Sequence, residues 1–251
     1  LYPIPRAAKR QEIGINPNQL PFYGVDCWNH YEVSWLNDKG KPMVGIAEII
    51  YDCRSPKLIE SKSLKFYFNS FNNTKISSID ALESMVKCDL EKRIEADVVV
   101  RIVTLNQANA FNIQALKGES IDTLDVECSV YLVEPAFLEV ENEEISETLS
   151  SDLLKSNCLV TNQPDWGSVQ ITYTGKKINR AGLLKYLVSF RNHNEFHEQC
   201  IERIFVDIMN QCKPTSLTVY GRYTRRGGLD INPYRSTEQT VFTGNLRLIR
   251  Q

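Results

Sequence analysis

Leu64-Lys65-Phe66-Tyr67-Phe68-Asn69-Ser70-Phe71-Asn72-Asn73 returns 119 residues later as Leu183-Leu184-Lys185-Tyr186-Leu187-Val188-Ser189-Phe190-Arg191-Asn192, with five identical residues in ten positions. The register continues beyond this segment, because Glu83 aligns with Glu202 at the same offset. Self-similarity at a fixed offset indicates a repeated structural unit. The chain therefore contains two copies of one supersecondary unit.

Each copy changes its hydrophobic periodicity in the same order, which predicts two ββααββ modules. Alternating stretches are typical of strands, and amphipathic stretches that begin at capping residues are typical of helices. The first copy is predicted to form strands at 26–36, 43–51, 97–105 and 125–133 and helices at 61–71 and 79–90. The second is predicted to form strands at 159–161, 169–173, 216–224 and 240–249 and helices at 180–190 and 196–210. Between them, the acidic run 139–144 predicts a solvated connector, and a short helix is expected at 145–155.

The expected fold class is α+β, with an antiparallel four-stranded sheet and two helices on one face in each module. Such a sheet leaves its other face and both edges in need of cover. Pairing of two modules, and then of two chains, would provide that cover. We therefore expect a protein of two modules that also associates into a homodimer.

The composition excludes several classes of protein. A chain of 251 residues with 42% hydrophobic residues can bury a full-sized core. Its net charge of −2 provides no general field for nucleic acid or an acidic membrane, so neither is expected as a direct partner. The sequence shows no long apolar run and no export segment, and its seven cysteines lack paired spacing. These features favour a reducing, cytoplasmic location.

The residues with the clearest chemistry surround Cys158. This cysteine lies in a polar segment with Asp165, and the run His193-Asn194-Glu195-Phe196-His197-Glu198 follows it. A thiol can become a nucleophilic thiolate, a carboxyl group can deliver a proton, and a His-Glu pair can bind a polar ring. The alternative for Cys158 is a buried structural thiol, which is the more common role of an arbitrary cysteine.

Four motifs carry a resemblance to a known family. They are Glu60-Ser61-Lys62-Ser63-Leu64-Lys65-Phe66-Tyr67, the segment 158–167, the segment 189–198 and Arg225-Arg226-Gly227-Gly228-Leu229-Asp230-Ile231-Asn232-Pro233. In this order they resemble the NADPH-dependent 7-cyano-7-deazaguanine reductases of the long, two-module kind. The resemblance implies the tunnelling fold, in which ββααββ modules join into a barrel around a channel. It also implies a first module at 1–138, a connector with a short helix at 139–155 and a second module at 156–251.

The resemblance implies that a nitrile, 7-cyano-7-deazaguanine, is reduced to the amine 7-aminomethyl-7-deazaguanine in the biosynthesis of queuosine, a modified nucleoside of tRNA. A nitrile carbon is a modest electrophile, and addition of a thiolate gives a thioimide that is easier to reduce. Cys158 matches the nucleophile and Asp165 the proton-transfer residue. Because the reduction takes four electrons, two molecules of NADPH are expected per substrate.

The resemblance also assigns binding residues and implies no metal. Glu198 would accept hydrogen bonds from the base, and cationic side chains would bind the cofactor's phosphates. The residues matched to the substrate are Ile59, Glu60, Ser61, His197 and Glu198, and those matched to NADPH are Ser61, Lys62, Arg226 and Gly227. Solvent-facing roles are the alternatives for Glu198 and for Arg226.

Three other functions remain open from the residues alone. The first is a zinc-dependent cyclohydrolase of the same fold, with Cys158, His197 and Cys200 as ligands. The second is a module that binds a purine-like base without catalysis. The third is a cysteine hydrolase or nitrilase, which would need no NADPH.

Overall fold

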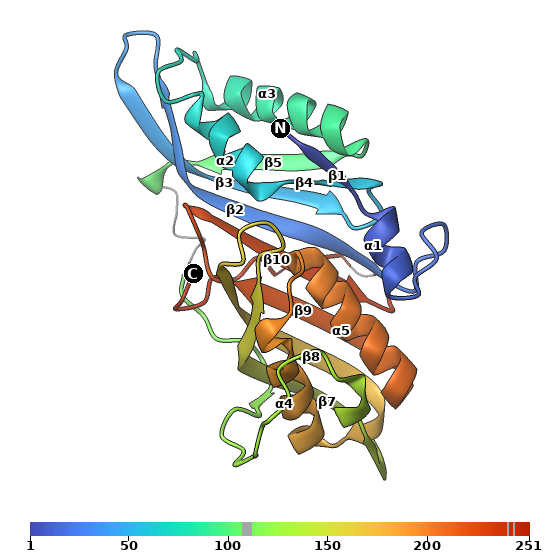
Figure 1. Cartoon of the computed structure of the whole chain (residues 1–251). Coiled ribbons are helices and arrows are strands. Elements are labelled where there is room, and N and C mark those ends of the chain that lie inside the picture. Colours follow the sequence, from blue (N-terminus) through green and yellow to red (C-terminus); the bar gives the residue numbers. More distant parts are fainter. Residues whose placement is uncertain (107–111, 240, 243) are drawn as a thin grey trace.

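The computed structural model of the chain describes residues 1–106, 112–239, 241–242 and 244–251. Figure 1 shows the elements in sequence colours, with the first half of the chain above the second. In chain order they are β1 (Pro3–Pro5), α1 (Ala7–Glu12), β2 (Tyr23–Leu36), β3 (Pro42–Asp52), β4 (Lys57–Ile59), α2 (Ser61–Asn69), α3 (Ile79–Ile94), β5 (Val98–Val103), β6 (Glu119–Ser120), η2 (Pro135–Phe137), β7 (Val140–Asn157), β8 (Pro164–Ile178), α4 (Arg180–Ser189), η3 (Phe190–Asn192), α5 (His197–Cys212), β9 (Ser216–Tyr223) and β10 (Leu229–Ser236).

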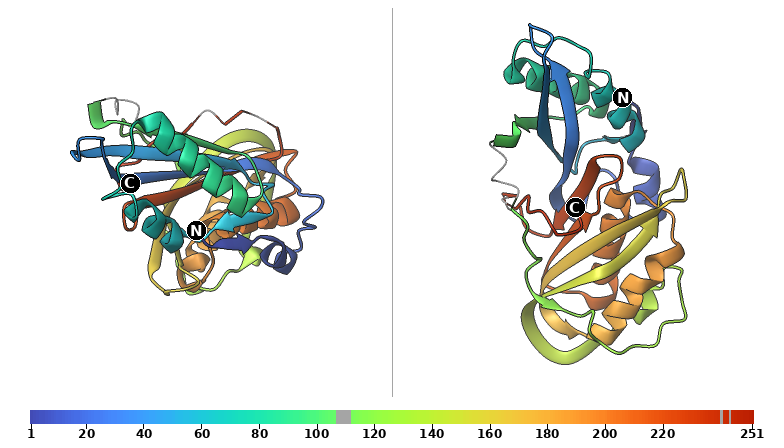
Figure 2. Two further views of the ribbon diagram at one scale, coloured as in Figure 1. Left: turned by 90° about the horizontal axis from the view of Figure 1, so that it is seen from above. Right: turned by 90° about the vertical axis from the view of Figure 1, so that its left-hand side faces the viewer.

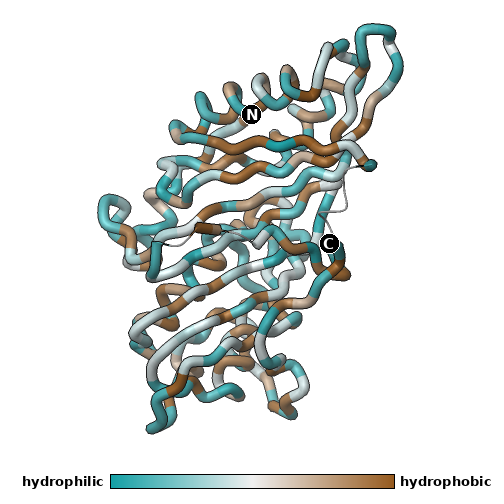
Figure 3. Tube along the Cα trace, turned by 180° about the vertical axis from the view of Figure 1, so that it is seen from behind, coloured by the Kyte–Doolittle hydropathy of each residue, from teal (hydrophilic) through white to brown (hydrophobic). Residues whose placement is uncertain are grey.

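An eight-stranded sheet runs through the whole molecule in the order β5-β3-β2-β10-β9-β8-β7-β6. Its pairings are antiparallel except for the short parallel pair β6–β7. Helices α2 and α3 pack on the first half of the sheet, and α4 and α5 pack on the second half (Figures 1 and 2). Seen from behind, the strands lie toward the viewer, with hydrophilic and hydrophobic residues interspersed along them (Figure 3). The expected α+β class, with an antiparallel sheet and helices on one face, is confirmed.

The two hydrophobic cores of the molecule interlock across the middle of the sheet. Leu229 and Ile231 of β10, in the second half of the chain, belong to the core under α2 and α3. In return, Phe22 and Cys53 from the first half belong to the core under α4 and α5. Separation of the two halves would therefore expose apolar surface from both cores, which is unfavourable in water.

The helices predicted at 61–71, 79–90, 180–190 and 196–210 are confirmed as α2, α3, α4 and α5, and their packing repeats the sequence repeat. The Tyr67 hydroxyl donates a hydrogen bond to Asp89 at 2.8 Å, between α2 and α3. The Tyr186 hydroxyl donates to Asp207 at 2.6 Å, between α4 and α5. The strands predicted at 26–36, 43–51, 97–105, 169–173 and 216–224 are also confirmed, as β2, β3, β5, part of β8 and β9.

Several predicted elements are wrong. Residues 125–133 form no strand, and residues 159–161 lie in a turn. The described part of 240–249 forms no strand, and residues 240 and 243 of that prediction lie outside the described residues. The segment 139–155, expected as an acidic connector and a helix, belongs to the long strand β7 instead.

Pairing with β8 explains why the acidic segment is a strand. β7 pairs with β8 over almost its whole length, and the side chains of Glu141 and Glu143 lie 3.3 and 3.2 Å from the Lys177 amine of β8. Solvent-facing glutamates opposite a lysine are compatible with a strand near a sheet edge. The acidic composition of 139–144 therefore predicted a connector where the structure has a strand.

Strand β10 was missed because it is polar and contains a proline. Proline normally argues against a central strand. Here Pro233 lies opposite Asp26 of β2, and pairing with β9 begins only at the next residue, Tyr234. The buried polar residues of β10, such as Asp230 and Asn232, form hydrogen bonds within the sheet rather than facing solvent.

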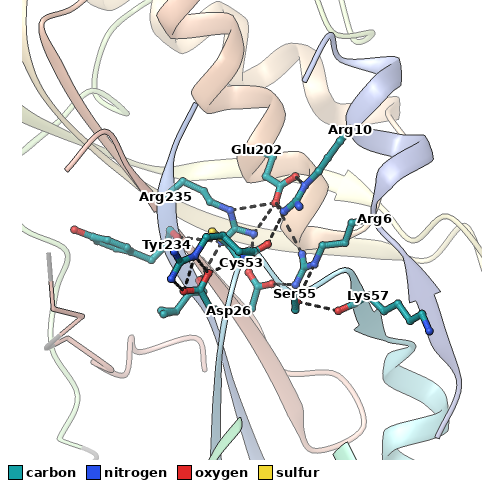
Figure 4. A network of polar contacts seen from close by, with 12 residues as sticks. Arg6, Arg10, Asp26, Cys53, Ser55, Lys57, Glu202, Tyr234 and Arg235 are labelled. Atoms are coloured by element: carbon teal, nitrogen blue, oxygen red, sulfur yellow. Dashed lines mark hydrogen bonds and ion pairs between the residues drawn. The ribbon is translucent and has the colours of Figure 1, made fainter. Parts of the chain in front are cut away.

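A buried cluster of charged side chains joins the two halves of the chain (Figure 4). Arg10 donates two hydrogen bonds to Glu202, at 2.9 and 2.7 Å, and Arg235 contacts both Glu202, at 2.9 Å, and Asp26, at 2.8 Å. Arg6 is ion-paired with Asp26 and lies 3.9 Å from Glu202. All five residues are at most 3% exposed. We name these residues the seam cluster.

Removal of one carboxylate from the seam cluster should be costly. Glu202→Gln would leave Asp26 as the one carboxylate of the seam cluster against three buried arginines, so the free energy of unfolding should fall by about 3–5 kcal/mol. Urea unfolding followed by tryptophan fluorescence measures this change. The control is Glu143→Gln, which removes an exposed ion pair and should leave the midpoint unchanged. Equal midpoints for Glu202→Gln and the wild type would contradict the interpretation.

Candidate active site

Cys158 lies in a tight turn between β7 and β8, with its side chain partly exposed. The Cys158 amide donates to the carbonyl of Gln163 at 2.8 Å, and the Asn162 amide donates to the carbonyl of Cys158 at 3.0 Å. Partial burial alone would raise the pKa of the thiol. Hydrogen bonds from Thr161, Val160 and the Arg226 guanidinium outweigh that effect, and the pKa of Cys158 lies below its usual value. A lowered pKa favours the nucleophilic thiolate.

Asp165 lies at the start of β8, beside the thiol turn, and is 6% exposed. Its carboxylate lies 3.3 Å from the Arg226 guanidinium and 3.6 Å from Nε2 of His197. The His197 ring packs edge-on against Tyr223, with centroids 4.2 Å apart. Arg226 thus contacts both Cys158 and Asp165, so a thiol, a carboxyl group and an imidazole lie within one group of contacts.

A small cavity at this site is lined from both halves of the chain. Its lining residues are Ser61, Lys65, Asp165, His197, Thr224, Arg226, Leu229 and Ile231. Ser61 and Lys65 belong to α2, in the first half, whereas His197 belongs to α5, in the second. Sites between structural units are a common place for ligands.

Glu198 lies next to His197 on α5 and is buried to 1% exposure. Desolvation, followed by repulsion from Asp26, raises the pKa of this carboxyl from its usual 4.5 to about 7, while Arg6 and His197 act in the opposite direction. Among the described residues, Oε1 of Glu198 and both polar side-chain atoms of Gln199 have no hydrogen-bond partner. Unpaired buried polar atoms are rare and costly. These atoms could bind the polar edge of a ligand.

The other residues expected at the site lie in varied settings. Glu60 caps α2, with its carboxylate accepting hydrogen bonds from the amides of Lys62 and Ser63 at 2.8 and 2.6 Å. Ile59 is buried in the first core, and the Lys62 side chain is exposed, with its amine 6.0 Å from the Phe66 ring. None of these three residues lines the cavity described above.

The turn that carries Arg226 is held by the first half of the chain. Gly227 and Gly228 both adopt positive φ angles, of +60° and +71°, which favour glycine. The Gly228 carbonyl accepts a hydrogen bond from the Tyr31 amide at 2.7 Å, at an irregularity in β2. A Cβ at Gly227 would lie 3.2 Å from the Lys65 side chain. The turn that contains Gly227 therefore packs closely against Lys65 of α2.

Lys65 is the main residue that the sequence analysis overlooked. Burial lowers the pKa of its amine, and the nearby Arg226 guanidinium lowers it further. Two cations held close together beside a cavity fit a ligand that carries phosphate groups, because an anion relieves their repulsion. The spacing contained a signal, since Lys65 follows Ser61 by four residues and so shares its helix face. Thr161 was also overlooked, although it follows Cys158 by three residues, as in a capping pattern.

The geometry gives no support to a zinc site at Cys158, His197 and Cys200. No group of three or more His, Cys, Asp or Glu side chains in the described part of the chain is arranged to hold a metal ion. Burial strongly raises the pKa of the Cys200 thiol, and the nearby Glu195 carboxylate raises it further.

Comparison with known proteins agrees with this geometry. Residues 1–102 match the family model described as "Nitrile reductase, 7-cyano-7-deazaguanine-reductase N-term", and residues 164–241 match that of "QueF-like protein". A relative from Legionella pneumophila (strain Lens), named NADPH-dependent 7-cyano-7-deazaguanine reductase, is 65% identical over all of this chain and 89% of its own length. The chain belongs to this reductase family. A relative with the same name from Ralstonia nicotianae is 56% identical, over all of this chain and 92% of its own length.

Membership in the 7-cyano-7-deazaguanine reductase family confirms the expected class of NADPH-dependent oxidoreductases. A solved structure titled as the apo form of the archaeosine synthase QueF-Like aligns with 40% of this chain at 14% identity and a TM-score of 0.34. None of the helices in the described ranges is long and apolar enough to cross a membrane.

The raised pKa of Glu198 predicts a dependence of stability on pH. In the folded protein the Glu198 carboxyl has a pKa of about 7, whereas its usual pKa is 4.5. The contribution of Glu198 to stability is therefore lost as the pH rises between these two values. Glu198→Gln, which stays neutral, should therefore be more stable than the wild type at pH 8. The two proteins should differ little at pH 5. Urea unfolding at both pH values tests this, and an equal difference at pH 5 and pH 8 would contradict it.

Proposed function

We propose that this protein reduces 7-cyano-7-deazaguanine to 7-aminomethyl-7-deazaguanine with NADPH, through a covalent thioimide at Cys158, in the cytoplasm and on the path to queuosine in tRNA. The observation that carries the proposal is the lowered pKa of the Cys158 thiol, next to Asp165 and Arg226. A non-catalytic binding module has no use for an activated thiol. A hydrolase would not explain the family's dependence on NADPH.

The proposed first step forms one bond and moves one proton. Asp165 accepts the thiol proton of Cys158, and the thiolate attacks the nitrile carbon, forming the C–S bond. The proton on Asp165 then passes to the nitrile nitrogen, which gives a neutral thioimide and regenerates the carboxylate. Arg226 stabilises negative charge first on sulfur and then on Asp165, because it contacts both groups.

Two hydrides and two protons complete the reduction. When bound, NADPH supplies the hydrides, one from each of two molecules. The C–S bond breaks before the amine forms, and its electron pair returns to Cys158. His197, beside Asp165, is placed to carry protons near neutral pH. The site also has to exclude water, which would hydrolyse an imine intermediate.

Glu198 is proposed as the anchor for the base. Its buried carboxylate has an unpaired oxygen and can accept hydrogen bonds from the ring N–H and amino group of a deazaguanine. His197 completes this side of the pocket, while Ile59, Glu60 and Ser61 are proposed to contact the base from the first half of the chain. Ser61 gives the most direct support for a pocket built from both halves of the chain, because it lines the same cavity as His197.

Ser61, Lys62, Arg226 and Gly227 are proposed to bind NADPH, with Lys65 added to this set by its place in the cavity. Lys65 and Arg226 fit phosphate groups because an anion relieves the repulsion between these two cations. The φ angle of +60° at Gly227 lets the backbone approach a ligand closely. The Lys62 side chain is exposed and is not part of the seam cluster, so its amine could contact a bound phosphate.

We also propose that two chains pair as a homodimer and close the barrel of the tunnelling fold. In the described part of the chain the sheet ends at β5 on one side, and on the other side the outer edge of β7 pairs with the two residues of β6 alone. Strands at sheet edges can pair with another chain. The module divisions 1–138, 139–155 and 156–251 remain part of this proposal, with β7 now spanning the middle segment.

The central mutational prediction concerns the thiol. Cys158→Ala should bind 7-cyano-7-deazaguanine but consume no NADPH, because no thioimide can form. The wild type should consume two NADPH per amine, measured by absorbance together with chromatography of the product. Cys88→Ala, at an exposed cysteine on α3, is the control and should keep full activity. Turnover by Cys158→Ala would rule out covalent catalysis.

A second prediction concerns the base anchor. Glu198→Gln should weaken binding of 7-cyano-7-deazaguanine by about 1–3 kcal/mol, because donors of the base lose their charged acceptor. Isothermal titration calorimetry on the Cys158→Ala background measures the dissociation constant without turnover. An unchanged constant would remove Glu198 from the pocket.

A further inference from the structure

We propose that Asn194 is a positioning residue that holds the Cys158 turn in the conformation in which backbone amides face the sulfur. The proposal rests on the role of Cys158 as nucleophile in the proposed function. Asn194 lies outside the cavity, and it acts through the turn rather than on a ligand.

The Cys158 turn has the geometry of a capped helical turn. The Asn162 amide donates to the carbonyl of Cys158, four residues back, at 3.0 Å. The backbone amides of Val160 and Thr161, two and three residues after the cysteine, lower the pKa of its thiol. A serine or aspartate at the start of a helix accepts hydrogen bonds from the amides at the same two positions. Cys158 therefore occupies a capping position, where a thiolate is stabilised more than a neutral thiol.

Asn162 ends this turn in a left-handed conformation, with a φ angle of +55°. Only glycine adopts this conformation freely, and asparagine tolerates it better than most residues. A residue in such a conformation persists when surrounding contacts fix it. If Asn162 relaxes to an extended conformation, the Asn162 amide leaves the Cys158 carbonyl and the turn opens. The amides of Val160 and Thr161 would then no longer converge on sulfur.

The Asn194 side chain contacts both ends of the turn. Its amide nitrogen donates to Oδ1 of Asn162 at 2.9 Å and reaches the carbonyl of Cys158 at 3.5 Å. Its side-chain oxygen accepts a hydrogen bond from the Asn157 side chain at 3.4 Å. One side chain thus bridges the first and last residues of the turn and the residue before it.

Asn194 is itself held firmly. The Asn157 amide donates to the His193 carbonyl at 2.8 Å, and the Glu195 amide donates to the Asn157 carbonyl at 3.1 Å. Glu195 is buried and accepts two hydrogen bonds from Arg203 of α5, at 3.0 and 2.8 Å.

These contacts attach the nucleophile turn to the segment that begins α5. His197 and Glu198 stand at the start of that helix, three and four residues after Asn194. The same segment therefore places the thiolate and the two residues proposed to contact the substrate.

The test measures the thiol itself. Asn194→Ala should raise the midpoint of the pH dependence of Cys158 alkylation by iodoacetamide by about 0.5–1 pH unit, and slow alkylation at pH 7 about three- to tenfold. Peptide mapping follows Cys158, and the exposed Cys88 in the same sample provides an internal reference. Asn162→Ala should give a similar shift, because alanine is strained at φ +55° and lacks the acceptor for Asn194. Asn192→Ala, at an exposed residue two positions from Asn194, is the matched control.

An unchanged midpoint in both Asn194→Ala and Asn162→Ala would overturn the proposal, as would an equal shift in Asn192→Ala. Asn162 is exposed, so its variant remains informative if Asn194→Ala fails to fold. The dissociation constant for 7-cyano-7-deazaguanine should change less than twofold, about 0.4 kcal/mol, in Asn162→Ala. Alkylation needs neither nitrile nor NADPH. A wild type that fails to reduce the nitrile would therefore refute the proposed function and leave this test intact.

Discussion

The buried ion pairs of the seam cluster are the constraint on which the rest of the structure depends. Charges are expensive to bury, and they are stable inside a protein only when partners of opposite charge accompany them. Arg6, Arg10 and Asp26 come from the first half of the chain, whereas Glu202 and Arg235 come from the second. The first half alone would leave Arg10 without a carboxylate partner, and the pairs Arg10–Glu202 and Asp26–Arg235 join the two halves, so these ion pairs favour one register between them. In that register β10 lies beside β2, and Glu202 of α5 lies beside Arg10.

The same cluster sets the electrostatics of the candidate substrate site. Glu198 lies one helical turn before Glu202 on α5, and it would be a third carboxylate among three arginines. Its desolvation and the nearby Asp26 keep the pKa near 7, so the apo protein holds a carboxyl group poised between its two charge states. Donors from a bound base would favour the ionised form. The protein thus accepts a cost in stability at Glu198 that a ligand can offset.

The sequence predicted the repeat, the four helices within the two modules and five of the eight module strands, because periodicity and capping act locally. It failed where distant pairing decides the element. β7 is a strand because β8 lies beside it, and β10 is a strand because the seam satisfies its buried polar residues. At the site, resemblance identified Cys158, Asp165 and His197, which the structure brings together with Arg226. The spacing of Lys65 from Ser61 on one helix face was a local signal that went unused, whereas the role of Asn194 depends on contacts between segments far apart in sequence, which local patterns do not reveal.

These features combine into one account, in which the seam holds the two halves of the site together and a turn of backbone amides prepares a thiolate for addition to a nitrile. The most direct test is the intact mass of the protein after incubation with 7-cyano-7-deazaguanine and no NADPH. The account predicts an increase equal to the mass of one nitrile, located at Cys158 by peptide mapping and absent from Cys158→Ala. An unmodified mass under conditions where the nitrile is bound would contradict it.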